Sequence, residues 1–414
     1  MSGRSANDLR LEISDEGEEI CDIYKEHMLL LDAIKNHNCA LVHDLVHNHG
    51  LSPDFNVNGY SPICVAAQYG FVDILDILVE GGCSLITENS DTWKRQAVHV
   101  AASKGQNEFV KRLVSYGADI NSRDSDQRTP LHWAATYGNA DMAEFLISEG
   151  AAVNIAQSDG FTSLHAATCL GHNHVVKVLL NHGAELNRTD RDGWSAFHTA
   201  VCYGHTEVVK SLLDAGASLT KLTSDEENVV HIAASSGKID VLRLLLEKKM
   251  NLNDMNVNGN TAFYLSVYYN ELNMTKFLIK VGADMSLPRG PKKSPLYLAA
   301  MRSNIDVISL FLAADYNFSC EEWILQKDFP QVLLKLPKLC NLLYRKASNT
   351  QTLKDLCRSC IRRSVKYDLN FEARIKQLHL PVLLQDFISY QGLDNFVESL
   401  NEFLKKVASE TSLT

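Results

Sequence analysis

A segment of 33 residues repeats along most of this chain of 414 residues. The stretch RTPLHWAATYGNADMAEFLISEGAAVN begins at Arg128, and similar stretches begin at Phe161 and Trp194. One position of the repeat, here called the polar slot, carries a polar residue in each copy: Ser61, Gln96, Thr129, Thr162, Ser195, Asn228, Thr261 and Ser294. Successive slots lie 33 residues apart, except that Ser61 and Gln96 lie 35 apart. A fixed period of this length predicts stacked units, each burying its apolar face against its neighbours.

Each copy has the pattern of two short helices. Thr129 and Pro130 favour a helix start, because the hydroxyl caps free N–H groups and proline is tolerated in the first turn. Gly138 predicts the end of that helix in a left-handed conformation. The second helix of a later copy carries Val208, Val209 and Leu212 at helical spacing, which predicts one apolar face.

These features together resemble the ankyrin repeat, over residues from about 25 to 318. The resemblance implies an all-α solenoid of about nine helix-pair repeats with short hairpin loops, counting a degenerate copy around Ala33. A histidine recurs at one slot of five copies: His99, His132, His165, His198 and His231. In the family this residue forms hydrogen bonds between adjacent repeats. Ligands of one zinc ion lie ~2.0 Å from it, so histidines in separate repeats are not expected to share a metal.

The resemblance also implies which positions line the target-binding side, namely the residue before the polar slot and those before the glycine that ends the first helix. Aromatic and arginine side chains are enriched among the anchors of protein interfaces. The predicted target-binding residues are Tyr60, Arg128, Tyr137, Phe161, Trp194 and Tyr203. Packing against neighbouring loops is the alternative for any one of these side chains. Trp133 lies at a core slot and is expected to be buried.

Composition excludes several classes of protein. A formal net charge of −10 argues against general nucleic-acid binding. No apolar run approaches the ~20 residues of a membrane helix, and the acidic start lacks the apolar segment of a signal peptide. Ten cysteines without such a signal predict free thiols and a cytoplasmic protein. We also find no catalytic motif, and expect no enzyme activity, cofactor or metal.

The period fails after Phe318, and residues 319–349 predict a helical connector that covers the last repeat. Cys357 and Cys360 follow in the stretch TLKDLCRSCIRRSV. Such a pair can contribute to a zinc site, perform redox chemistry or face one side of a helix. On a helix, both cysteines join one apolar stripe with Leu353, Leu356 and Ile361, and the sequence has no second pair of this spacing to complete a structural zinc site.

This stripe resembles the elongin-binding half of a SOCS box, which we assign to residues 350–390. The resemblance implies that Leu353, Leu356, Cys357 and Ile361 bind elongin C. The following segment resembles the cullin-binding half, with Leu378, Leu380 and Pro381 as the implied contacts. His379 stands where the family's first proline belongs, and this departure puts the choice of cullin in doubt. Residues 1–24 are expected to be an acidic disordered tail, and residues 391–414 a C-terminal helical tail.

The chain is therefore identified as a member of the ankyrin repeat and SOCS box family. Membership implies a non-catalytic substrate receptor of a ubiquitin ligase, with elongin B and elongin C, a cullin of the fifth type, its RING partner and an unidentified target protein as partners. A scaffold that binds elongin without degrading a target remains the alternative, and a metal enzyme built on Cys357 and Cys360 ranks last.

Overall fold

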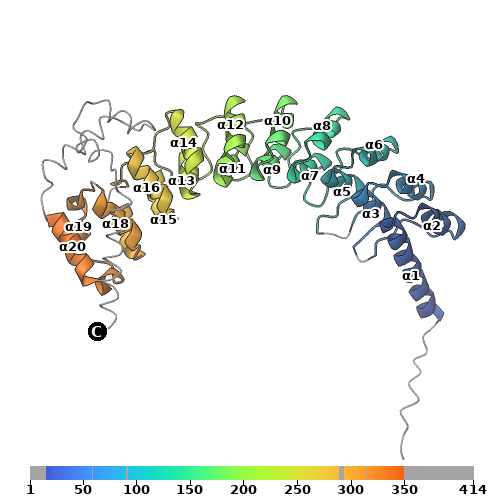
Figure 1. The fold of residues 1–414 in the computed structure, drawn as a ribbon, viewed down its shortest axis with the longest axis horizontal. Helices are drawn as coiled ribbons and strands as arrows, with labels where there is room; N and C mark the ends of the chain where they lie inside the picture. Colours follow the sequence, from blue (N-terminus) through green and yellow to red (C-terminus); the bar gives the residue numbers. More distant parts are fainter. Residues whose placement is uncertain (1–14, 58, 90–91, 289–292, 315, 349–414) are drawn as a thin grey trace, which may run out of the picture. The chain divides into compact units, whose positions relative to one another are not determined.

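A computed structural model describes residues 15–57, 59–89, 92–288, 293–314 and 316–348 of the chain (Figure 1). Throughout these residues the regular structure is helical, and the only β-type pairing is isolated bridges such as that between Ala156 and Thr162. The predicted all-α class is confirmed. Backbone contacts divide the chain into two units, Met1–Glu185 and Leu186–Thr414.

The first unit contains five helix pairs. Its helices are α1 (Asp15–Lys35), α2 (Cys39–His43), α3 (Pro62–Tyr69), α4 (Val72–Glu80), α5 (Ala97–Lys104), α6 (Asn107–Ser115), α7 (Pro130–Tyr137), α8 (Ala140–Ser148), α9 (Ser163–Cys169) and α10 (Asn173–Asn181). A single π-helical turn, Asp44–Asn48, follows α2. The first helices of successive pairs contact one another from α1 through α3, α5 and α7 to α9, so the pairs stack in chain order (Figure 1).

The second unit continues the same arrangement with four pairs and a short cap. The paired helices are α11 (Ala196–Tyr203), α12 (Thr206–Asp214), α13 (Val229–Ser235), α14 (Ile239–Glu247), α15 (Ala262–Tyr268), α16 (Leu272–Val281), α17 (Pro295–Met301) and α18 (Ile305–Ala313). After them come α19 (Glu322–Leu325) and α20 (Pro337–Ser348), with single 3-10 turns at Phe318–Cys320 and Leu333–Lys335. The described residues thus contain the nine helix pairs expected from the repeat.

Local features of each pair follow from the sequence. Ala134 and Ala135 are fully buried in α7, where their small side chains allow the helices of adjacent repeats to approach closely. Gly138 follows α7 with φ of +75°, the left-handed conformation predicted for the residue that ends this helix. Thr129 and His132 complete a capping box at the start of α7, which satisfies backbone N–H groups that the first turn leaves free.

The cap after α18 buries a carboxylate among hydrogen-bond donors. Glu321 is 4% exposed and accepts hydrogen bonds from the Ser294 hydroxyl at 2.8 Å, the Tyr316 hydroxyl and the Trp323 indole N–H. The Trp323 ring also contacts Tyr297 of α17 edge-on, with ring centroids 5.3 Å apart. The connector therefore packs on the last helix pair, which a stack of repeats needs at its end.

The start of the chain differs from expectation. Helix α1 begins at Asp15, inside the range 1–24 expected to be a disordered tail. Leu30, Leu31 and Ile34 are buried in the C-terminal half of α1, which packs on α2 and α3. Once a helix has nucleated, adding further residues costs little, so composition alone places its first residue poorly.

Candidate protein-binding surface

The repeated histidines connect neighbouring repeats inside the stack. In the neutral ring of His132, Nδ1 accepts a hydrogen bond from the Thr129 backbone N–H at 3.2 Å, while Nε2 donates to the Phe161 carbonyl oxygen of the next repeat at 3.3 Å. The equivalent bond of His99 reaches Arg128 O at 3.2 Å. Nε2 of His99, His198 and His231 also bonds to a carbonyl oxygen six residues earlier in the loop, at Ser122, Lys221 and Asp254, with distances of 3.0, 3.1 and 2.8 Å. The predicted structural role is confirmed for His99, His132, His198 and His231.

Burial keeps these imidazoles neutral. It lowers the pKa of His132 to about 4, because the charged ring would lose its hydration inside the stack. The pKa values of His99, His198 and His231 are lowered for the same first cause, although carbonyl oxygens at Nε2 partly oppose the shift. A protonated ring would also be unable to accept the backbone N–H at Nδ1. These histidines therefore fix the distance between repeats and leave the outer surface for binding.

Large side chains that end the first helices are exposed. Tyr69 and Tyr137 are the last residues of α3 and α7, Leu170 follows α9, and Tyr203 ends α11. Together with Tyr60, which precedes α3, they are between 44% and 54% exposed. Tyrosine presents a large apolar area at low entropic cost and a hydroxyl for hydrogen bonding, so such rings suit a protein interface.

Arg128 belongs to a compact cluster of arginine and tryptophan side chains in the first unit. Its guanidinium lies 5.6 Å from the ring of Trp93 and 5.1 Å from that of Trp133, and it also forms an ion pair with Asp126. Arg95 lies 5.4 and 4.6 Å from the same two rings. Cations this close to an aromatic face are attracted by its quadrupole.

Trp133 anchors this cluster from within the core. It is 2% exposed, as its slot predicts, and its indole N–H donates to Asp124 Oδ2 at 3.0 Å. Trp93 contacts it edge-on with centroids 5.3 Å apart, and the Tyr137 ring stacks on it with centroids 6.2 Å apart. Sequence reasoning missed Trp93. The available signal was the two-residue insertion between the slots of Ser61 and Gln96, which lengthens the loop that carries this tryptophan.

The aromatic rings of Phe161 and Trp194 are less exposed than the tyrosine rings at the ends of the first helices. Both are half-buried, and each packs on the histidine of its own repeat: Phe161 on His165 at 4.9 Å, and Trp194 on His198 at 6.3 Å. The Trp194 backbone N–H donates to Asp190 Oδ1 at 2.8 Å, which places the ring at the end of a closed turn. The two rings therefore contribute part of their area to packing, the alternative that the sequence left open.

The predicted elongin-binding and cullin-binding residues, from Leu353 to Pro381, lie outside the described residues, as do Cys357 and Cys360. Within the described part of the chain, no helix combines the length and the apolar character required to cross a membrane.

Comparison with known proteins identifies both parts of the chain. The family described as ankyrin repeats (3 copies) matches residues 29–124, 83–157, 131–223 and 218–289, and the SOCS box family matches residues 349–389. A Xenopus laevis protein, "Notch-regulated ankyrin repeat-containing protein", is 39% identical over 100 residues, which cover 23% of this chain and 85% of that protein.

Ankyrin repeats followed by a SOCS box are the organisation of substrate-recognition adaptors of cullin-RING ubiquitin ligases, and such adaptors are typically non-catalytic. The repeats account for more than half of the chain, and the SOCS box follows the end of α20. The chain belongs to the family of ankyrin repeat and SOCS box-containing proteins.

Proposed function

We propose that this chain is the substrate receptor of an elongin-cullin-RING ubiquitin ligase. The observation that carries the proposal is the joining of a stacked ankyrin array to a SOCS box in one chain. The array binds a target protein, and the box recruits elongin B and elongin C, a cullin of the fifth type and its RING partner. Holding the target beside the charged ubiquitin carrier makes the transfer effectively intramolecular, and the ubiquitinated target is then degraded.

Elongin C binding is assigned to the apolar stripe formed by Leu353, Leu356, Cys357 and Ile361. Their spacing places them on one side of a helix, which suits insertion into an apolar groove. Leu378, Leu380 and Pro381 are assigned to the cullin. The receptor supplies no bond-making residue in this scheme, so we expect it to be non-catalytic.

The target is proposed to bind along the exposed ends of the first helices. Tyr60, Tyr137 and Tyr203 offer exposed rings, and Arg128 contributes a guanidinium held against two tryptophans. Phe161 and Trp194 offer the remaining edges of half-buried rings. Within each unit the stacked helices position these side chains before the target arrives, which reduces the entropy lost on binding.

We place the receptor in the cytoplasm. Among the described residues no cysteine is in a disulfide, including the buried Cys64, Cys83 and Cys340, which fits a reducing compartment.

Co-purification with elongin B, elongin C and the N-terminal half of the fifth cullin tests the ligase assembly. The parent chain is expected to give a stoichiometric complex, and a Leu353→Asp, Cys357→Asp variant to lose it. Lys354→Asp is the matched control, because it introduces an acidic residue beside the stripe but off its apolar side. Loss of the complex in both variants, or in neither, would refute the assignment.

Target recognition has its own test. Proximity labelling in cells should identify proteins that the parent labels and the Tyr137→Ala variant labels less. Glu144→Ala is the control, since Glu144 is exposed on α8 of the same repeat but lies on the second helix. Targets should accumulate when Leu353 is mutated. Equal labelling by the parent and both variants would contradict binding at the ends of the first helices.

Cullin binding distinguishes the proposed receptor from a non-degradative scaffold, and His379 is the residue that puts this binding in doubt. If elongins bind and the cullin does not, the scaffold function is favoured. A His379→Pro variant then restores the family's residue and should recover cullin binding if this position alone weakens the second half of the box. If the His379→Pro variant binds the cullin no better than the parent, the histidine at this position does not weaken the cullin-binding half of the box.

A further inference from the structure

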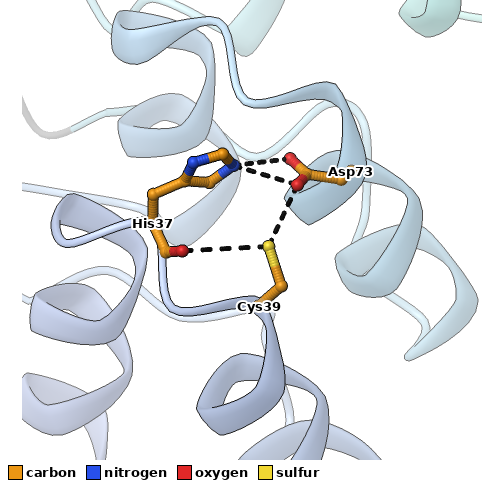
Figure 2. Close-up of side chains that lie close together, drawn as sticks. All are labelled: His37, Cys39 and Asp73. Atoms are coloured by element: carbon orange, nitrogen blue, oxygen red, sulfur yellow. Dashed lines mark hydrogen bonds and ion pairs between the residues drawn. The ribbon is translucent and has the colours of Figure 1, made fainter.

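Three side chains with metal-binding atoms converge between the first and second repeats (Figure 2). His37 Nε2 lies 3.0 and 2.9 Å from the two carboxylate oxygens of Asp73, and Cys39 Sγ lies 3.0 Å from Asp73 Oδ2. All three donor atoms lie within 4.8 Å of one another. His37 occupies the turn after α1, Cys39 begins α2, and Asp73 lies in the first turn of α4. Among the described residues, this is the one group of three such side chains with this geometry.

Contacts outside the cluster position the side chains of His37 and Asp73, and a helix cap fixes the backbone beside Cys39. The imidazole of His37 stacks on the Phe71 ring with centroids 4.0 Å apart and planes within 9°. The Asp73 Oδ1 atom accepts a hydrogen bond from the Ile74 backbone N–H at 3.0 Å. Asn38, between His37 and Cys39, caps α2 by accepting from the Leu41 N–H at 3.1 Å. These contacts keep the imidazole, the carboxylate and the start of α2 near one another before any ligand binds, which favours a specific site.

The donor set fits a borderline-soft divalent ion. Zinc binds imidazole nitrogen, thiolate sulfur and carboxylate oxygen together, whereas calcium and magnesium prefer several oxygen ligands, and this cluster offers one carboxylate. Tetrahedral zinc would separate the oxygen from the nitrogen by about 3.4 Å and from the sulfur by about 3.6 Å. The present distances of 2.9 and 3.0 Å need to widen by roughly half an ångström to reach those values. Side-chain rotation supplies such a shift, because His37 and Asp73 are 47% and 53% exposed.

We propose that His37, Cys39 and Asp73 bind one zinc ion, with water as the fourth ligand. In the metal-free site, hydrogens on His37 Nε2 and Cys39 Sγ bond to the Asp73 carboxylate. When the ion binds, it replaces both hydrogens: Cys39 binds as the thiolate, and the neutral His37 ring carries its proton on Nδ1. The thiol proton is released to solvent. The exposed side of the cluster leaves room for the water ligand.

The proposed ion joins the degenerate first repeat to the second. His37 and Cys39 are separated from Asp73 by 36 and 34 residues, so the site cross-links α2 to α4 at the N-terminal end of the stack. A ligand that binds only the folded state stabilises that state by mass action. Zinc is therefore expected to stabilise the first repeat, which among the described residues packs on a neighbouring repeat on one side.

Cobalt titration of the purified full chain tests the site. Co²⁺ substitutes for zinc, and a Co²⁺–thiolate bond gives an intense near-ultraviolet absorption band. We expect the parent to show this band with one equivalent bound and to lose it when Zn²⁺ is added. Cys39→Ser should abolish the band, and Asp73→Asn should weaken binding at least ~10-fold. Zn²⁺ should raise the melting temperature of the parent and not that of Cys39→Ser.

Matched controls separate this site from other cysteines. Cys320→Ser removes an exposed thiol of the second unit, and Cys357→Ser, Cys360→Ser removes the C-terminal pair. Both controls should keep the band and the thermal response. Circular dichroism at 222 nm checks that every variant is folded. A parent without the band, a band that persists in Cys39→Ser, or one that disappears in the C-terminal double variant would overturn the proposal.

Discussion

The stack should weaken in acid because its buried histidines must stay neutral, and His132 allows the effect to be calculated. Its pKa is about 4 in the folded chain and 6.5 in the unfolded chain. Between these values the unfolded chain binds more protons, so the free energy of unfolding falls as the pH falls. This stabilising contribution is complete above about pH 6.5 and is lost progressively down to about pH 4. At 1.36 kcal/mol per pKa unit, the loss between pH 7 and pH 5 is about 2 kcal/mol.

A His132→Gln variant isolates this effect. Glutamine is a capping-box residue and does not titrate, so the variant retains a possible partner for the Thr129 N–H at every pH. The variant should be less stable than the parent at pH 7, and the difference should shrink by about 2 kcal/mol at pH 5. His99, His165, His198 and His231 are present in both chains, and their contributions cancel in the comparison.

Urea unfolding followed by tryptophan fluorescence measures the difference between pH 5.0 and 7.5. Trp133 lies beside His132 in α7 and contacts Trp93, so these two of the four tryptophans report on the same repeat. Amide hydrogen exchange in α7 checks the result, because repeats in a stack can unfold in stages. His43→Gln is the control, as this ring is exposed. A stability difference that stays constant from pH 7 to pH 5 would refute the assignment of the buried neutral state to His132.

Other predictions test individual contacts. Gly138→Ala should destabilise the chain by about 1–2 kcal/mol, because alanine is strained at φ of +75° and its Cβ would lie 2.7 Å from His172 Nδ1. Gly150→Ala is its control, with φ of +96° and no atom within 4 Å of the added carbon, so calorimetry should find a smaller loss there. Trp133→Phe should cost roughly 2 kcal/mol, since it removes a donor from the buried Asp124 carboxylate, and denaturant unfolding measures this. Glu321→Ala should melt the cap before the repeats, with protease cleavage near α19 as the readout, because it leaves three donors without their acceptor.

The repeat made the fold predictable, because one pattern constrains every copy. A polar slot, a small pair such as Ala134 and Ala135 and a glycine such as Gly138 each express a backbone requirement that recurs every 33 residues. The start of α1 was not predictable in the same way, since no neighbouring copy fixes its register. The helix at Asp15 depends on propagation from buried residues further along the chain.

Binding surfaces were predictable only by position. The slots of Tyr60 and Tyr137 follow from the repeat, but the exposure of each ring depends on side chains that the pattern does not specify. Phe161 is half-buried because His165 lies beneath its ring. The convergence of His37, Cys39 and Asp73 was also invisible in the sequence, because Asp73 lies in a different repeat and its approach depends on how two copies pack.

Under the proposed function, departures from the regular repeat are the places to test for specificity toward a target. Residues that every copy shares serve stacking, so they cannot distinguish one target from another. The two-residue insertion before Gln96 breaks the period, and Trp93 in that loop joins Arg95, Arg128 and Trp133 in one cluster. The longer loop costs entropy, and its contacts offset that cost: the Trp93 ring packs on Trp133, and the Trp93 carbonyl oxygen accepts a hydrogen bond from the Ser125 N–H at 2.9 Å. The cluster around Trp93 is therefore a feature of one copy and not of the repeat, and under the proposed function Arg95→Ala should change target binding without changing the stacking of the other copies.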